Sequence, residues 1–161
     1  MRVEKMKNFI VSLFGHREID DLFKLEKLLF PVIKGLIQTK TYVSFFVGRN
    51  GEFDEYAASV IKRAQKAVGK ENNEITLVLP YSVASIEYYG NYYDDIIIPG
   101  SLSGVHSKAA ITQKNRWMVE MSDLVIVYVA RNKGGAYEAM KYAKKLNKNV
   151  INLCDETVNN F

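Results

Sequence analysis

The chain has 161 residues, the usual size of one domain, and its 48% hydrophobic and 25% charged residues are typical of a globular protein. Cys154 is the one cysteine, so an internal disulfide is excluded and a reducing compartment is indicated. No apolar run reaches the roughly 18 residues that a membrane span requires, so no membrane partner is expected. We therefore expect a cytoplasmic protein with one domain over 1–161, a core over about 9–153 and a frayed C-terminal tail.

The first half of the chain alternates apolar runs with amphipathic segments. Apolar runs that stop at a glycine or proline predict buried strands, whereas apolar residues at helical spacing predict helices. Asp20 or Asp21 is placed to cap the first helix, and Pro31 inside that helix predicts a kink. In chain order we expect a strand over 9–14, a helix over 22–37, a strand over 42–47, a helix over 53–64 and a strand over 74–79.

The second half continues this alternation and contains the most strand-like run of the chain, over 124–129. A short run over 95–98, bounded by Pro99 and Gly100, is a candidate for an extra strand. The remaining expected elements are a helix over 107–121, a helix that opens at Gly134-Gly135, and a closing strand over 150–153.

The alternation of strands and helices predicts an α/β fold. Nearly continuous apolar strands are covered on both faces, which indicates a mostly parallel sheet between two layers of helices. Right-handed crossovers favour a Rossmann-like sheet of about five strands in the order 3-2-1-4-5, in which 124–129 is the fourth strand. Ligands bind such sheets beyond the carboxyl ends of the strands where the order reverses. The loops 15–17 and 130–136 should meet there, flanked by the loop 48–54.

The first of these loops contains Gly15, His16 and Arg17. A glycine lets the chain turn sharply at the strand end, and the Arg17 guanidinium can hold a phosphate through two hydrogen bonds. The alternative is a surface loop in which Arg17 pairs with Glu18 or Asp20.

The second loop contains Gly48, Arg49, Asn50, Gly51 and Asp54. Glycines between a buried strand and a helix predict a turn whose N–H groups hold an anion at the helix N-terminus. Arg49 would add a positive charge there. Asp54 could bond a ribose hydroxyl, or it could stabilise the first turn of its own helix.

The third loop contains Lys133, Gly134, Gly135 and Ala136, and it again joins a strand to a helix start. The two glycines allow a phosphate to approach the backbone closely. Glu138, about one turn into the helix, could face a ribose or a glycosidic carbon. The alternative is an ordinary turn with an acid near a helix start.

The helix over 107–121 contributes Asn115 and Arg116, which could reach the same pocket from the side. No catalytic triad, second cysteine or cluster of carboxylates and histidines is evident, so we expect no metal site and no bound cofactor.

Charge and aromatic residues add two further expectations. The net charge of +4 is scattered, and it serves either solubility or the steering of phosphate-bearing ligands. Four tyrosines lie between Tyr88 and Tyr93, where they could stack on single-stranded nucleic acid. We favour a half-buried flap that closes over the ligand.

Five motifs, in order and spacing, resemble the YpsA-like branch of the SLOG superfamily, which is named for the Smf/DprA and LOG (Lonely Guy) proteins. The resemblance covers about Val11 to Leu153. The motifs are Phe14-Gly15-His16-Arg17, Gly48 to Asp54 followed by Ala57-Ala58, Leu79-Pro80, Lys114 to Val119 with Ser122-Asp123, and Gly134-Gly135-Ala136 with Tyr142-Ala143.

This resemblance implies a Rossmann-like fold and a pocket for nucleotides or nucleotide-derived ligands, and it adds Pro80 to the predicted ligand-binding residues. Some members of the superfamily are phosphoribohydrolases, others sense nucleotide signals, and others bind single-stranded DNA. Because members often self-associate, the resemblance also implies a possible homodimer.

The chain departs from the family pattern in two loops. After the second strand the family pattern is similar to Gly-Gly-Ala-x-Gly-x-Asp, whereas this chain has Arg49, Asn50 and Glu52 at the second, third and fifth positions. Arg49 could clasp a phosphate or fill the pocket. In the last loop Ala136 stands where a threonine is expected, and Glu138 follows Gly135 sooner than the glutamate of the hydrolytic pattern Gly-Gly-x-Gly-Thr-x-x-Glu.

We favour a protein that binds a nucleotide-like small molecule as a sensor or ligand-binding module. The alternative is an enzyme that cleaves an N-glycosidic bond, a phosphoribohydrolase or deoxyribosyltransferase-like enzyme, with Glu138 as its catalytic group and Arg17 or Arg116 on the phosphate. Binding of single-stranded nucleic acid is the least favoured alternative, because the charge is scattered and no nucleic-acid motif is recognised.

Overall fold

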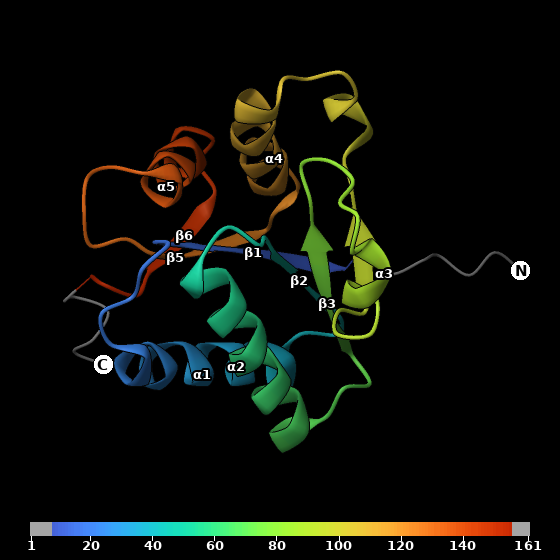
Figure 1. Ribbon diagram of the computed structural model, residues 1–161. Helices are drawn as coiled ribbons and strands as arrows, with labels where there is room; N and C mark the ends of the chain where they lie inside the picture. Colours follow the sequence, from blue (N-terminus) through green and yellow to red (C-terminus); the bar gives the residue numbers. More distant parts are fainter. Residues whose placement is uncertain (1–7, 156–161) are drawn as a thin grey trace, which may run out of the picture.

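A parallel sheet forms the centre of residues 8–155, the part of the chain that the computed structural model describes. The strands are β1 (Phe9–Gly15), β2 (Val43–Val47), β3 (Asn73–Val78), β4 (Asp95–Ile97), β5 (Leu124–Tyr128) and β6 (Asn149–Asn152). They are ordered β4-β3-β2-β1-β5-β6, and every neighbouring pair is parallel. The order reverses between β1 and β5 (Figure 1).

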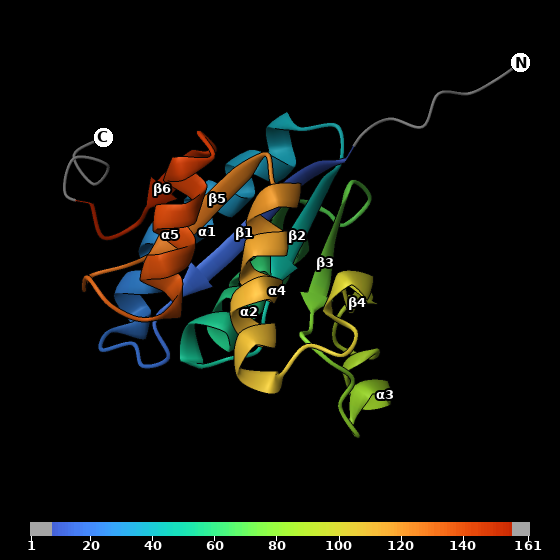
Figure 2. The same ribbon diagram turned by 90° about the horizontal axis from the view of Figure 1, so that it is seen from above.

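Helices cover both faces of this sheet. The helices are α1 (Leu22–Thr39), α2 (Glu52–Val68), the single turn α3 (Ile86–Tyr89), α4 (Ser107–Met121) and α5 (Gly135–Lys145). Figure 1 shows α1 and α2 below the sheet and α4 and α5 above it, and Figure 2 shows α4 and α5 lying across the strands. The predicted α/β class, a three-layer Rossmann-like fold, is confirmed. None of the helices within 8–155 has the length and apolarity needed to cross a membrane.

The sheet has one more strand than the five that were expected. The run over 95–98 forms β4, which pairs with β3 at the edge of the sheet, so the other five strands keep their predicted relative order. Helix α1 continues as one helix through Pro31, and its cap is Asp21, whose carboxylate accepts the Lys24 N–H at 3.0 Å. The predicted fraying of the C-terminal tail concerns residues outside the described range.

Two apolar clusters fill the spaces between the layers, because alternate side chains of a strand face opposite sides of the sheet. Val11 and Leu13 of β1 pack in the cluster between the sheet and helices α1 and α2, together with Phe53. Phe14 packs in the cluster beneath α4 and α5, together with Met118. Burying a side chain of this size contributes about 1.5–3 kcal/mol. These clusters hold the strand ends, and therefore the loops that follow them, in fixed positions.

The close approach of Gly15 to the start of α2 positions two of these loops. A Cβ atom at Gly15 would overlap the Phe53 ring and would lie 2.6 Å from the Phe53 Cβ. Phe53 is fully buried, so its ring has no free space into which it could move. A glycine at the end of β1 therefore lets the N-terminus of α2 lie directly against this strand.

Candidate functional site

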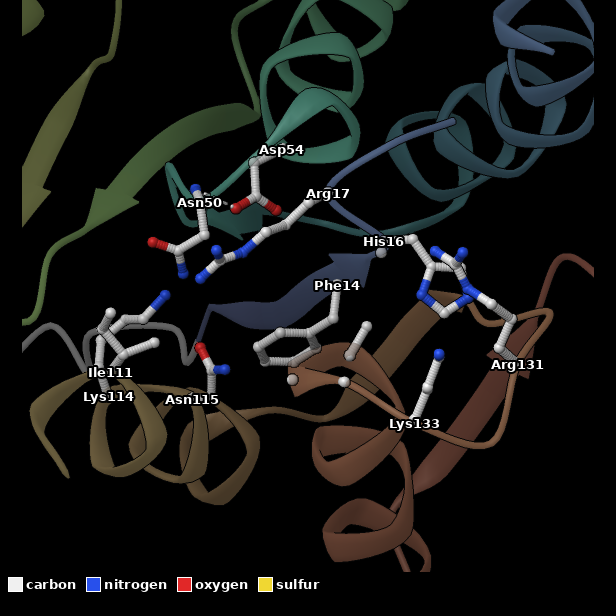
Figure 3. Close-up of a pocket in the computed structure, with 14 residues that line it drawn as sticks. Phe14, His16, Arg17, Asn50, Asp54, Ile111, Lys114, Asn115, Arg131 and Lys133 are labelled. Carbon is white, nitrogen blue, oxygen red and sulfur yellow. Dashed lines mark hydrogen bonds between the residues drawn. The ribbon is translucent and has the colours of Figure 1, made fainter. Parts of the chain in front are cut away.

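A cavity of about 350 Å³ lies at the carboxyl ends of β1 and β5, where the strand order reverses (Figure 3). Its volume falls within the roughly 300–1,000 Å³ typical of small-molecule sites. Its walls come from the loops after β1, β2 and β5, from the start of α5, and from one side of α4. The predicted meeting of three loops at this edge is therefore present in the structure.

His16 joins two of these loops. Its Nε2 atom accepts a hydrogen bond from the Ala130 N–H at 2.9 Å, so the loop after β1 is tied to the loop after β5. Burial lowers the pKa of the His16 imidazole, and the positive charge of Arg131 lowers it further. An imidazole that accepts at Nε2 is neutral and has its proton on Nδ1.

Acid should therefore weaken the fold through His16. Because the folded-state pKa lies below the ordinary value of 6.5, the unfolded chain takes up this proton first as the pH falls. The His16 contribution to stability is present above 6.5 and decreases as the pH falls from there to the folded-state pKa. Between about pH 8 and about pH 5, the free energy of urea unfolding should fall less for His16→Gln than for the wild type, since glutamine keeps an acceptor but does not titrate. An equal loss in both proteins would contradict this account.

The backbone of Arg17 is held by the start of α2. Its carbonyl oxygen accepts the Glu52 N–H at 2.8 Å, and the Glu52 carboxylate accepts the Ile19 N–H at 2.9 Å. Gly51 lies so close that a Cβ atom there would be 2.5 Å from the Arg17 Cα. The Arg17 side chain extends from this fixed point into the cavity (Figure 3).

A buried carboxyl and a buried amine lie at the same end of the cavity. Asp54 is 8% exposed and accepts the Asn50 N–H at 2.8 Å. Lys114 is 1% exposed, and Figure 3 shows its amine directed toward Asn50. Burial raises the pKa of the Asp54 carboxyl against the opposing effect of Lys114, and it lowers the pKa of the Lys114 amine against the opposing effect of Asp54.

The opposite end of the cavity is formed by the N-terminus of α5. Gly134 has a φ of +97°, a conformation that favours glycine, and no side chain caps the helix that follows it. The first N–H groups of α5 are therefore available to an anion, and the helix dipole favours negative charge there. Arg131 and Lys133 lie at this end with His16 (Figure 3).

The lining carries more positive than negative charge. Arg17, Lys114, Arg131 and Lys133 line the cavity, and Asp54 is the carboxylate among the lining residues. The buried Oδ1 atom of Asn115 accepts no hydrogen bond from any residue in the described part of the chain. An anionic ligand that also carries a hydrogen-bond donor would satisfy both features.

Most of the predicted ligand-binding residues are brought together here. Those that line the cavity are Gly15, His16, Arg17, Asn50, Asp54, Asn115, Lys133, Gly134, Gly135 and Ala136. Gly48 and Gly51 lie behind the lining, against Lys114 and Arg17.

Arg49 and the tyrosines between Tyr88 and Tyr93 lie outside the larger cavity. The Arg49 guanidinium stacks 4.3 Å from the centre of the Tyr89 ring, and it lines a second cavity of about 220 Å³ with Glu55. The tyrosines between Tyr88 and Tyr93 also line this second cavity and do not line the larger one. The structure therefore does not bring Arg49 to the α5 end, and the expected tyrosine flap does not cover the larger cavity.

Three other predicted residues also lie outside the lining. Arg116 is exposed and stacks on Tyr142, 5.0 Å from the ring centre. Pro80 is buried beyond the end of β3. Glu138 is 63% exposed and lies 4.0 Å from the Lys141 amine. Glu138, the predicted catalytic residue, is thus not part of the cavity.

Phe14, Ile111, Lys114 and Arg131 line the cavity but were not predicted as site residues. Lys114 could have been found by treating it with Asn115, which is adjacent in the same helix. No sequence pattern singles out Arg131, which lies in an exposed loop.

Comparison with known proteins identifies the fold. No family model and no curated protein matches the chain. DNA processing protein A (DprA) from Streptococcus pneumoniae is similar with a TM-score of 0.64 at 16% identity, over 89% of this chain and 49% of that chain. This chain therefore spans about half the length of that DprA.

Two further structures are similar. The molybdenum cofactor carrier protein MCP from Chlamydomonas reinhardtii has a TM-score of 0.57 at 15% identity, over 89% of this chain and 75% of that chain. DprA from Helicobacter pylori, described with its single-stranded DNA binding mode, has a TM-score of 0.60 at 14% identity, over 88% of this chain and 63% of that chain. At identities of 14–16%, these likenesses show a Rossmann-like fold.

Proposed function

We propose that this protein, a YpsA-like member of the SLOG superfamily, binds a small phosphorylated, nucleotide-like ligand in the cavity between β1 and β5. One observation carries the proposal. Four cationic side chains and the uncapped N-terminus of α5 surround one cavity that contains a single lining carboxylate, Asp54. Because such a surplus of positive charge costs free energy when buried or crowded, an anion is the expected occupant.

The phosphate belongs at the α5 end. There the first-turn N–H groups, Arg131 and Lys133 offer hydrogen bonds to an anion, each worth about 1.5–3 kcal/mol when one partner is charged. The other end mixes donors and acceptors, from the Lys114 amine to the unpaired Asn115 Oδ1. This mixture suits the hydroxyls of a sugar or the edge of a base, which both donate and accept.

Binding of a small molecule is favoured over binding of a strand. The similar structures are named for single-stranded DNA binding and for carrying the molybdenum cofactor, so the fold serves ligands of different kinds. Within the described residues, four positive side chains line one cavity of about 350 Å³. A cavity of this kind fits one nucleotide-sized molecule better than an extended backbone.

The glycosidase alternative is less favoured because Glu138 does not reach the cavity. Glu138→Gln should therefore leave the affinity for nucleoside monophosphates unchanged within error. It should also leave unchanged any conversion of nucleotide to free base, measured by chromatography. Loss of turnover in this variant, with binding kept, would instead support the enzyme with Glu138 as its catalytic group.

A thermal-shift screen tests the proposed function. The melting temperature of the purified protein is measured with nucleoside monophosphates, cyclic nucleotides, NAD and ADP-ribose, and with the matching nucleosides as controls. A ligand at ~100 times its dissociation constant adds about 2.7 kcal/mol of stability, which is easily visible. We expect stabilisation by phosphorylated members and none by nucleosides. Equal shifts with nucleosides, or no shift with any compound, would contradict the proposal.

A further inference from the structure

Lys114 is an unusual residue to find buried in the middle of α4. It is 1% exposed, yet its amine forms no hydrogen bond or ion pair with any residue between 8 and 155. Burying a lysine without an acceptor is unfavourable, so such a residue needs another explanation. Its amine faces the cavity (Figure 3), which makes it accessible to a bound molecule.

Gly48 lets this amine lie close to the backbone of the loop after β2. A Cβ atom at position 48 would lie 2.7 Å from the Lys114 Nζ and 3.1 Å from the Asp54 Oδ2. The amine and the carboxyl therefore flank the same small space, although they form no direct ion pair. Asp54 raises the pKa of the Lys114 amine through its charge, against the larger effect of burial, without forming an ion pair with it.

The cavity relates this amine to the proposed phosphate site. Figure 3 shows Lys114 at one end, Arg131 and Lys133 at the other, and Phe14 between them. A molecule whose phosphate is held at α5 would extend its other end toward Lys114. This step rests on the proposed function, because the phosphate site orients the molecule.

We propose that the Lys114 amine is a nucleophile that forms an imine with the carbonyl group of a phosphorylated aldehyde or ketone bound in this cavity. The structure places Lys114 and Asp54 together in the lining of the cavity, on either side of Gly48, and the proposed anion site at the far end of the cavity. Open-chain sugar phosphates belong to this ligand class.

The atoms and charges of the reaction balance with groups of this chain. The Lys114 ammonium gives a proton to the Asp54 carboxylate through an intervening water molecule, and the free amine attacks the carbonyl carbon. One proton of the attacking nitrogen then passes to the carbonyl oxygen, which gives a neutral carbinolamine. Asp54 returns the proton to the carbinolamine hydroxyl, which leaves as water while the nitrogen lone pair forms the C=N bond. The net change is an ammonium and a carbonyl converted to a protonated imine and one water. Burial raises the pKa of the Asp54 carboxyl and lowers the pKa of the Lys114 amine, which assists the first of these transfers.

Borohydride trapping on the wild-type protein tests the proposal. The protein is incubated with pyridoxal 5′-phosphate, reduced with sodium borohydride and mapped by peptide mass spectrometry, with pyridoxal as the phosphate-free control. We expect most of the label on Lys114, little label with pyridoxal, and protection by adenosine 5′-monophosphate. Label spread over surface lysines, or concentrated on Lys133, would overturn the proposal.

Two variants sharpen the result. Lys114→Arg keeps the positive charge but cannot form the imine, so it should lose the label; Lys108→Arg, on an exposed position of the same helix, should keep it. If Lys114→Arg does not fold by circular dichroism, the wild-type peptide map alone decides. A wild-type protein that binds nucleoside monophosphates in the thermal-shift screen but takes no label on Lys114 overturns this inference and leaves the proposed function standing. Failure of both experiments overturns both.

Discussion

Replacing Gly135 with aspartate should abolish nucleotide binding and leave the fold at least as stable as the wild type. Gly135 is the first residue of α5 and lines the cavity, so the introduced carboxylate would occupy the proposed phosphate site. An acid in the first turn favours the helix by about 0.3–1 kcal/mol. A phosphate would meet this like charge and lose hydrogen bonds worth about 1.5–3 kcal/mol each, a loss of roughly tenfold or more for each bond.

The matched control is Gly135→Ala. A Cβ atom at this position would have as its nearest neighbour the Asn115 Nδ2 at 3.7 Å, an ordinary contact, so alanine should fit and should largely keep binding. The wild type, Gly135→Asp and Gly135→Ala are compared by titration calorimetry with adenosine 5′-monophosphate and by urea unfolding. This comparison distinguishes the effect of the added charge from the effect of the added side-chain volume. Wild-type affinity in Gly135→Asp would show that the phosphate is not held at α5.

The largest effect on stability is expected at Gly15. Gly15→Ala would drive a methyl group into the buried Phe53 ring, so β1 and the start of α2 would have to separate. Overpacking of this kind costs about 1–3 kcal/mol. Because the same contact positions the loops after β1 and β2, ligand affinity should fall together with the free energy of unfolding. Urea unfolding measures the free energy of unfolding, and calorimetry measures the ligand affinity.

A second substitution tests the cause of this loss. Phe53→Leu removes part of the ring, so it should cost stability in the wild type but cost less, or restore stability, in the Gly15→Ala background. The control is Gly35→Ala in α1, where a Cβ atom meets nothing within 4 Å and alanine should add about 0.5–1 kcal/mol. Additive effects of Gly15→Ala and Phe53→Leu would show that the two residues are not coupled.

The fold was predictable because local signals agreed with one another. Apolar runs that stop at Gly15 and Gly48 marked strands, and their alternation with helices led to the parallel sheet and its reversal point. The edge strand β4 was the hardest element to predict, because it has three residues, none of them fully buried, which is too short to show the apolar pattern of a strand. The reversal point in turn indicated which loops would meet at one cavity.

The direction of individual side chains was less predictable. An α-helix turns by about 100° per residue, so Lys114 and Asn115 can face the cavity while Arg116, about 200° from Lys114, faces α5 and stacks on Tyr142. The spacing of a short polar run does not show which of its members faces inward. The buried Lys114 in particular contradicts the usual expectation that a helical lysine is exposed.

Two further side chains lie outside the cavity for different reasons. Arg49 follows β2 as expected, but its guanidinium is held by Tyr89, forty positions along the chain, and no local pattern indicates that contact. Glu138 lies in the first turn of α5, on an exposed face beside Lys141. Both residues were placed in the correct loop or helix, but tertiary packing determined where the Arg49 charge lies, and helix geometry turned the Glu138 carboxylate toward solvent.

An amide NMR titration with adenosine 5′-monophosphate, followed by the same titration with adenosine, tests the central claim most directly. The account predicts that the amide resonances of Gly134, Gly135 and Ala136 shift strongly with the monophosphate and little with adenosine, because these N–H groups hold the phosphate. Shifts confined to the tyrosines between Tyr88 and Tyr93, or equal shifts with both compounds, would contradict a phosphate site at the N-terminus of α5.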